Sequence, residues 1–178
     1  MAWAGAVVVA AVVPYLPSLR GKFVLDDWAL IVNDSLVHSI SNLPKVFFTD
    51  FLRGSLGPEI PYYRPLVTAT FQINYWLSGP HPLEFRITNV ILHVVASLLV
   101  VALGWRLTRS ALAAGVAGLA FAVLPAHAEP VAWISGRTDV LSCILVRSAL
   151  LALLPESERG IGWPRAVLGS LLFLCGLL

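Results

Sequence analysis

The feature that most constrains this chain is a series of long apolar runs separated by short polar segments. Hydrophobic residues make up 58% of the 178 residues and charged residues only 12%, and the mean hydropathy is +0.82. Soluble domains carry about 25% charged residues. The composition therefore predicts an integral membrane protein.

Five apolar runs are interpreted as membrane spans, at about residues 2–19, 87–105, 110–126, 139–154 and 166–178. They predict an all-α, polytopic transmembrane helical bundle. A span needs about 20 residues, and the last run is cut short. We therefore expect the chain to be an incomplete N-terminal transmembrane module.

Basic residues in short loops predict the orientation of a membrane protein. Arginines lie in the short connections at residues 106–109 and 159–165, which are therefore predicted to be cytoplasmic. The long loop 20–86 and the turn 125–137 then share the outer face. Three short helices are expected in the long loop, at Asp27–Asn33, Leu43–Leu52 and Thr68–Leu77. The second is amphipathic, with Val46, Phe47 and Phe51 predicted on one side, along the membrane interface.

Several classes of function find no support in the sequence. The formal net charge is +2 and no lysine or arginine cluster is present, so no nucleic-acid partner is expected. Cys143 and Cys175 lie in apolar runs and are interpreted as small hydrophobic residues. Phosphate loops, Rossmann glycines and serine-nucleophile motifs are absent from the sequence.

Two adjacent carboxylates, Asp26 and Asp27, follow the first apolar run and precede Trp28. Charged groups kept beside hydrocarbon are costly and usually functional. This pair suits a general base or an anchor for a divalent metal. The alternative is a helix cap with a solvated neighbour.

His127 and Glu129 lie between Pro125 and Pro130, which favours an extended backbone. Residues two apart on an extended chain point the same way, so both side chains are predicted to face one site. They could bind a metal, relay a proton or position a hydroxyl. The alternative is a simple polar turn.

Two arginines are candidates for binding a phosphate, Arg64 in Tyr-Arg-Pro-Leu and Arg137 in Gly-Arg-Thr-Asp. A guanidinium can hold a phosphate through two parallel hydrogen bonds. The alternatives are contact with lipid headgroups for Arg64 and an interfacial, snorkelling side chain for Arg137.

Further polar residues lie within the spans. Arg86, Asn89 and His93 share one face of the second span. For Asn89 and His93, packing between helices is the favoured interpretation. Arg147 lies near the middle of the fourth span and must face protein or water. We expect it to pair with an acid that this chain does not contain.

Taken in order, these motifs resemble one family. Asp26-Asp27, Tyr63-Arg64-Pro65-Leu66, the Arg-x-x-Asn-x-x-x-His pattern of the second span and the segment 125–139 are similar to those of GT-C fold polytopic glycosyltransferases. The resemblance is specifically to the transmembrane-and-TPR-repeat protein O-mannosyltransferases and their bacterial relatives, and it covers nearly the whole chain.

This resemblance implies an enzyme that takes a sugar, with mannose as one candidate, from a polyprenyl- or dolichyl-phosphate donor. The acceptor would be a hydroxyl on a protein or glycan at the outer membrane face. The family's base in the first outer loop corresponds to Asp26 or Asp27, and we favour Asp26. His127 and Glu129 match the second outer motif and would line the same cavity. Arg64 and Arg137 are assigned to the donor phosphate on charge chemistry, and the metal requirement is left open.

The chain also departs from that family. It has fewer spans and no TPR repeats, so we expect it to be inactive alone. The bacterial inner membrane and the endoplasmic reticulum membrane are both compatible locations. The rival interpretations are a transporter or channel segment and a non-catalytic membrane scaffold. Transporters place polar groups near the bilayer midplane, whereas most of these lie at one membrane face.

Overall fold

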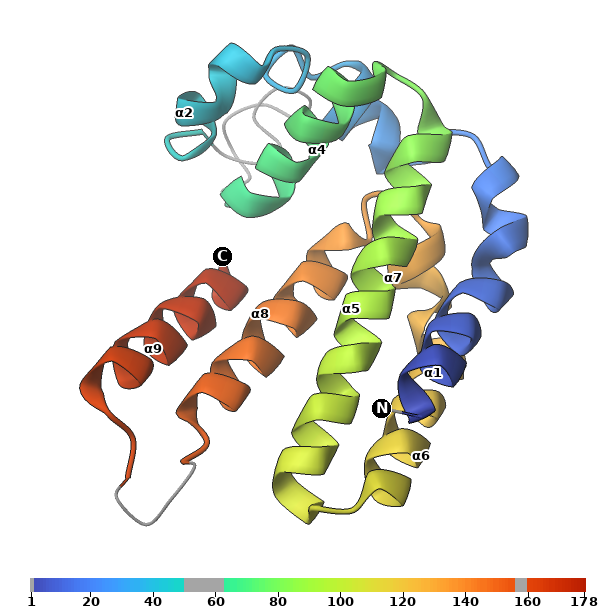
Figure 1. The fold of residues 1–178 in the computed structure, drawn as a ribbon. Helices are drawn as coiled ribbons and strands as arrows, with labels where there is room; N and C mark the ends of the chain where they lie inside the picture. The colour runs from blue at the N-terminus through green and yellow to red at the C-terminus, as the bar shows by residue number, and fades with distance from the viewer. Residues whose placement is uncertain (1, 50–62, 156–159) are drawn as a thin grey trace.

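A computed structural model describes residues 2–49, 63–155 and 160–178. Within these ranges the chain forms helices and turns and no strand (Figure 1), which confirms the predicted all-α class. The helices of the bundle are α1 (Ala2–Val12), α5 (Pro82–Thr108), α6 (Ala111–Val123), α8 (Arg137–Leu153) and α9 (Trp163–Leu177). The loop before α5 holds α2 (Leu43–Val46) and α4 (Pro65–Ser78), and the short α7 (Ala128–Ala132) follows α6.

Two helical segments are long and apolar enough to cross a membrane. They are Trp3–Arg20, in which a 3₁₀ helix at Val13–Arg20 continues α1, and the 27-residue α5. A third span results if α6 and residues 125–132 count as one, although they are bent by 51°. The chain is thus a multi-pass membrane protein by the length and composition of its helices. α8 and α9 form at the places predicted for spans four and five. With 17 and 15 residues, they are shorter than the two segments that can cross a membrane.

The longest helix, α5, organises the bundle. It contacts α1, α6 and α8, and α9 packs against α8 on the other side (Figure 1). The small residues of α6 allow close approach, since a Cβ built on Gly118 would lie 2.3 Å from Val101 of α5 and 3.3 Å from Val7 of α1. In Figure 1, α2 and α4 lie over one end of this bundle.

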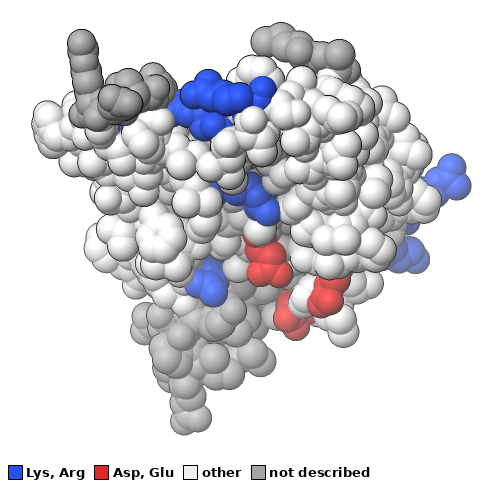
Figure 2. Space-filling model, turned by 90° about the horizontal axis from the view of Figure 1, so that it is seen from below, with Lys and Arg blue, Asp and Glu red and all other residues white. Residues whose placement is uncertain are grey.

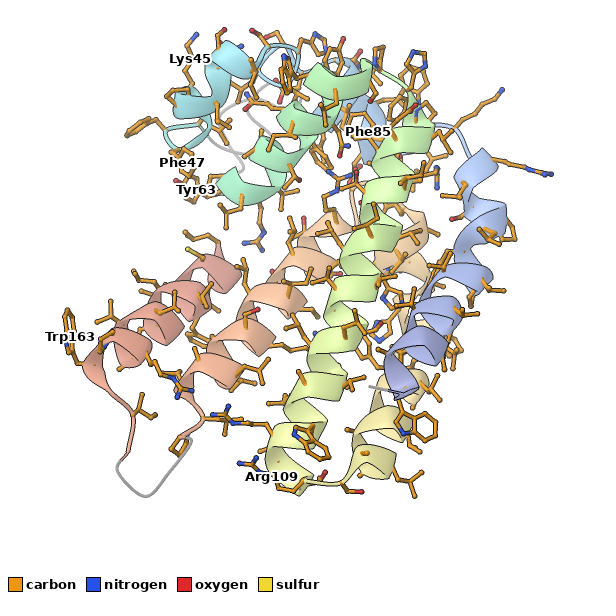
Figure 3. All side chains as sticks on the ribbon, viewed as in Figure 1. Lys45, Phe47, Tyr63, Phe85, Arg109 and Trp163 are labelled. Atoms are coloured by element: carbon orange, nitrogen blue, oxygen red, sulfur yellow. The ribbon has the colours of Figure 1, made fainter. Side chains whose placement is uncertain are left out.

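The two ends of the bundle differ in chemistry. The arginine end, defined by Arg106, Arg109 and Arg165, contains the α5–α6 turn and the C-terminus of α8 (Figure 3). Arg106 and Arg165 donate to the Leu154 carbonyl at 2.8 and 3.1 Å, which satisfies the end of α8. Figure 2, the view from this end, shows basic side chains at several places and a few acidic ones near the middle. Arg159 lies outside the described residues. We name the opposite end, which carries residues 20–49, α4 and the segment 125–137, the polar end.

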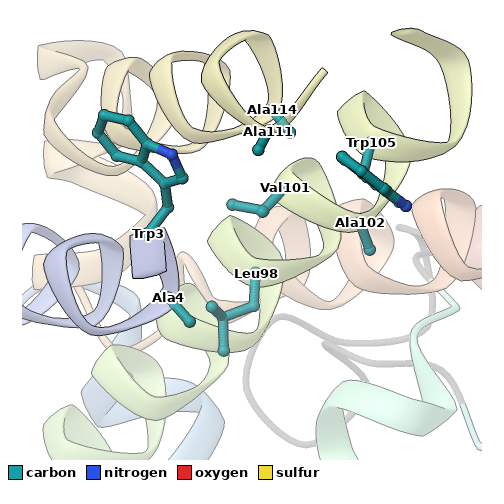
Figure 4. Close-up of a pocket in the computed structure, with 8 residues that line it drawn as sticks. All are labelled: Trp3, Ala4, Leu98, Val101, Ala102, Trp105, Ala111 and Ala114. Carbon is teal, nitrogen blue, oxygen red and sulfur yellow. The ribbon is translucent and has the colours of Figure 1, made fainter. Parts of the chain in front are cut away.

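An apolar cavity of about 490 Å³ opens between α1, α5 and α6. Figure 4 shows Trp3 of α1 and Trp105 of α5 on opposite sides of it. Its other lining residues are aliphatic, namely Ala4, Leu98, Val101, Ala102, Ala111 and Ala114. No acid, base or hydroxyl lines this cavity, so the candidate chemistry lies elsewhere.

The loop helices match the predictions in part. The helix predicted at Thr68–Leu77 is confirmed and begins earlier, at Pro65, where proline is favoured. A short π-helical stretch at Trp28–Val32 occupies the first predicted position. The amphipathic helix predicted at Leu43–Leu52 was wrong in the described part, because only Leu43–Val46 is helical. Val46 is buried and Phe47 exposed, so they do not share a side, and Phe51 lies outside the described residues.

The contact at Gly118 gives a stability prediction. Gly118→Val should lower the free energy of unfolding by about 1–3 kcal/mol, because the added methyls collide with α5 and α1. Ala120→Val, at an exposed position of the same helix, is the matched control. Thermal unfolding in detergent measures both, and equal melting temperatures would refute this packing.

Candidate active site

The two polar segments of the chain, the loop 20–86 and the turn 125–137, meet at the carboxylate of Asp27. Its Oδ1 accepts hydrogen bonds from the backbone N–H of Ser135 at 3.0 Å and from the Ser135 hydroxyl at 2.6 Å. Its Oδ2 accepts from the backbone N–H of Val24 at 3.0 Å. Asp27 is fully buried. The prediction that both segments lie at the same end of the bundle is therefore confirmed.

The adjacent carboxylate, Asp26, has a different environment. Its side chain is exposed, and no hydrogen bond joins it to the part of the chain that the structure describes. The preceding residue, Leu25, has a φ of +48°. This left-handed conformation costs about 1–2 kcal/mol for a residue other than glycine, and such strain clusters at functional sites. The turn thus fixes Asp27 inside the protein and leaves Asp26 at the surface.

The polar face of α5 holds the segment that carries Ser135. Asn89 Nδ2 donates to the carbonyls of Trp133, Ile134 and Val131 at 2.9, 3.3 and 3.4 Å. Arg86 donates to the Ala132 carbonyl and, at 2.6 Å, to the Lys22 carbonyl. The packing between helices predicted for Asn89 and His93 is confirmed, because Asn89 donates to the Val131 carbonyl of α7 and His93 Nε2 pairs with the Ala122 carbonyl of α6 at 3.1 Å. Arg86 also ties the two polar segments together, because Lys22 and Ala132 belong to different ones.

The guanidinium of Arg137 is also fully buried at this end. Its Nε donates to Asn89 Oδ1 at 2.7 Å, and its Nη2 donates to the Phe85 carbonyl at 2.8 Å. Its Nη1 donates to Asn74 Oδ1 at 2.7 Å and to Thr70 Oγ1 at 3.1 Å. The Phe71 and Phe85 rings lie 4.8 and 5.8 Å from its Cζ. Figure 3 shows Phe85 near the polar end of α5.

These contacts correct the phosphate role predicted for Arg137. All of its guanidinium nitrogens donate to protein oxygens, and no surface is exposed for a phosphate. The arginine instead joins α4, α5 and α8. The preceding Gly136 is also required, because a Cβ there would lie 2.8 Å from the Cα of Pro130. The Gly-Arg pair is therefore structural.

The extended backbone predicted for residues 127–129 was wrong. Pro125–His127 forms a 3₁₀ helix and Ala128–Ala132 is α7. A proline in the first turn of a helix is favourable rather than disruptive. His127 packs its ring 4.1 Å from that of Phe121, whereas Glu129 is exposed. On a helical backbone, residues two apart point in different directions. The side chains of His127 and Glu129 therefore do not face one site as predicted.

Arg64 binds backbone oxygens in this structure. Its Nη1 donates to the carbonyls of Leu177 and Leu178 at 3.3 and 3.2 Å, which connects the start of α4 to the end of α9. A phosphate role for Arg64 stays a prediction. Tyr63, labelled in Figure 3, donates to the Phe47 carbonyl at 2.8 Å.

Sequence reasoning missed the partners of the buried charges. Ser135 gave no signal, because it lies in a turn of ordinary composition. Thr70 and Asn74 are four residues apart on a predicted helix, so their shared face could have been recognised. The buried Asp34 was also missed. Desolvation raises its pKa, and this effect outweighs the hydrogen bond from the Leu36 N–H and the charge of His38, which lower the pKa.

A metal site was left open by the sequence. In the described ranges, no group of three His, Cys, Asp or Glu side chains lies close enough to hold a metal ion. We build no chemical step on a metal.

The fold and the buried network define a multi-pass helical membrane protein with an exposed acid on a strained turn. Comparisons with known proteins place it more closely. It is 36% identical over 146 residues to protein O-mannosyl-transferase F38B6.6 of Caenorhabditis elegans, covering 79% of this chain and 21% of that protein. It is 37% identical over 150 residues to the mouse protein O-mannosyl-transferase TMTC1, covering 82% and 16%. For human TMTC4 the values are 36% over 159 residues, covering 80% and 22%.

The chain is therefore homologous to the TMTC protein O-mannosyl-transferases, which confirms the predicted resemblance. It spans about a fifth of the length of these relatives. No family model matches the chain. No solved structure matches it either.

The network around Asn89 predicts a large effect on stability. Asn89→Ala removes the partner of the buried Arg137 Nε and of three carbonyls, and breaking a buried charged network costs about 3–5 kcal/mol. Asn33→Ala, at an exposed position, is the control. Denaturant unfolding in detergent measures the free energy of unfolding of both variants. A loss for Asn89→Ala no larger than that for Asn33→Ala would contradict the network.

Proposed function

We propose that this chain is the N-terminal module of a membrane glycosyltransferase that transfers a sugar, mannose in our proposal, to a hydroxyl on a protein or glycan. The proposed donor is a polyprenyl- or dolichyl-phosphate sugar. The names of the relatives support the transferase class. The observation that carries the proposal here is the division of the Asp pair into a buried Asp27 and an exposed Asp26.

In this proposal Asp26 is the general base. It takes the proton of the acceptor hydroxyl while the hydroxyl oxygen attacks the anomeric carbon of the sugar. The bond between that carbon and the phosphate oxygen breaks, and the lipid phosphate leaves with one more negative charge. Asp27 does not react, because its oxygens already accept from Ser135 and Val24. Its role is to hold the turn that presents Asp26.

The membrane supplies one substrate. A lipid-linked donor keeps its hydrocarbon tail in the bilayer, and its sugar reaches the polar end of the bundle. We propose that this end faces the outside of a bacterial inner membrane or the lumen of the endoplasmic reticulum. The rest of a longer protein would complete the enclosure of donor and acceptor, so the chain alone is proposed to be inactive.

Replacing each carboxylate separately tests the base assignment. In the full-length protein, Asp26→Asn should reduce sugar transfer by a factor of about 10²–10⁴, with normal expression and melting temperature. Asp27→Asn should lower the melting temperature. The carboxylate accepts three hydrogen bonds through two oxygens, whereas an Asn side chain has one acceptor oxygen and no charge. The assay is transfer of radiolabelled mannose from dolichyl-phosphate mannose in membranes.

Lys22→Gln, at an exposed position of the same segment, is the control and should behave as wild type. Unchanged transfer by Asp26→Asn at normal expression would refute the assignment.

A further inference from the structure

We infer that Arg147 and His127 form an anion site between α6 and α8 that binds the phosphate of the lipid-linked donor. This inference rests on the proposed function and names the part of the donor that the two side chains would recognise. The buried Arg137 takes no part, and a phosphate role for Arg64 stays a separate prediction.

Arg147 is a charged group that stacks on a ring and has no hydrogen-bond acceptor among the described residues. It lies near the middle of the 17-residue α8 and is partly exposed. Its Cζ lies 4.4 Å from the centre of the Phe121 ring. No hydrogen bond or ion pair joins its guanidinium to another described residue, so its donors face no oxygen there. A cation in an apolar helix is costly without an anion.

The direction of this side chain is set by the helix. Side chains on an α-helix point toward its N-terminus, and α8 begins at the polar end. Ten residues separate Arg137 from Arg147, a rise of about 15 Å. The guanidinium therefore reaches back toward the polar end, and Phe121, which it contacts, is two residues before the end of α6.

His127 contributes a second group at the same ring. Its ring centre lies 4.1 Å from that of Phe121 and 5.6 Å from that of His93. The Nε2 of His127 is buried and has no hydrogen-bond partner among the described residues, whereas His93 Nε2 pairs with the Ala122 carbonyl at 3.1 Å. A buried polar atom without a partner is costly. Arg147 and His127 thus lie against the same ring, Phe121, and neither the guanidinium nor His127 Nε2 has a hydrogen-bond partner among the described residues.

The space beside His127 limits how a phosphate can lie. A cavity of about 30 Å³ is lined by His127, Phe121, His93 and Cys143, among others. It holds a water molecule but not a phosphate. The phosphate would therefore lie beside Arg147 and reach His127 directly or through that water.

A phosphate suits this pair better than a carboxylate from another helix. The two oxygens of a carboxylate lie in one plane, whereas the oxygens of a phosphate are arranged tetrahedrally and can accept from two groups that approach from different directions, as Arg147 and His127 do. The charge of the departing phosphate rises during the transfer, so a cation there stabilises the leaving group. The exposed carboxylate of Asp139 lines the same cavity and should weaken anion binding.

The test measures binding of undecaprenyl phosphate to the full-length protein in nanodiscs, with undecaprenol and phosphatidylglycerol as comparison lipids. Arg147→Gln and His127→Gln should each weaken undecaprenyl phosphate binding by about tenfold or more and leave undecaprenol binding unchanged. Asp139→Asn should strengthen phosphate binding. Arg109→Gln, at an exposed position of the arginine end, is the matched control and should have no effect.

Several outcomes would overturn the site. Wild-type affinity of Arg147→Gln for undecaprenyl phosphate, or an equal loss for undecaprenol, would do so. An equal loss for phosphatidylglycerol would indicate a general site for anionic lipids. A lowered melting temperature without a phosphate-selective loss would indicate that Arg147 pairs with an acid of another helix.

The result is separable from that of the base assignment. Asp26→Asn should bind undecaprenyl phosphate normally, because the base does not contact the phosphate in this account. If Asp26→Asn abolishes transfer while Arg147→Gln binds normally, only the anion site fails. If Arg147→Gln loses phosphate binding while Asp26→Asn transfers normally, only the base fails.

Discussion

The buried guanidinium of Arg137 is the interaction on which the polar end depends. A charge withdrawn from water is tolerated only when its donors are satisfied, and here the acceptors come from α4 and α5. Asn89 is the shared member of this arrangement. Its carbonyl oxygen accepts from Arg137, and its amide nitrogen donates to the segment 131–134. One side chain therefore fixes both the charge and the backbone that precedes Ser135.

This network connects the bundle to the candidate base. Ser135 donates two hydrogen bonds to Asp27. Close by, Arg86 donates to the carbonyls of Lys22 and Ala132, which belong to the two polar segments. The turn that begins at Phe23 is thus held at several points, and the strain at Leu25 can be sustained. The consequence is that the exposed carboxylate of Asp26 projects from a turn whose backbone is held at the polar end. Positioning of this kind is a large part of enzymatic rate enhancement.

The sequence predicted the helical class, the places of the long helices and the meeting of the two polar segments, because hydrophobic periodicity and charge position determine these. The family resemblance favoured Asp26 as the base, but the sequence did not predict that Asp27 is buried and bonded to Ser135, since adjacent identical residues differ only in what surrounds them. Arg137 was misassigned because its acceptors, Asn74 and the Phe85 carbonyl, are more than fifty residues away in sequence. The prolines at 125 and 130 were read as extending the backbone, whereas each lies in a helical turn.

The most direct test of this account is the rate of sugar transfer by Ser135→Ala in the full-length protein. This change removes the 2.6 Å hydrogen bond to Asp27 without touching Asp26. The account predicts a fall in kcat of about tenfold with an unchanged KM for the donor, because the base is displaced while the donor site is not. A wild-type kcat in a normally folded Ser135→Ala protein would contradict it.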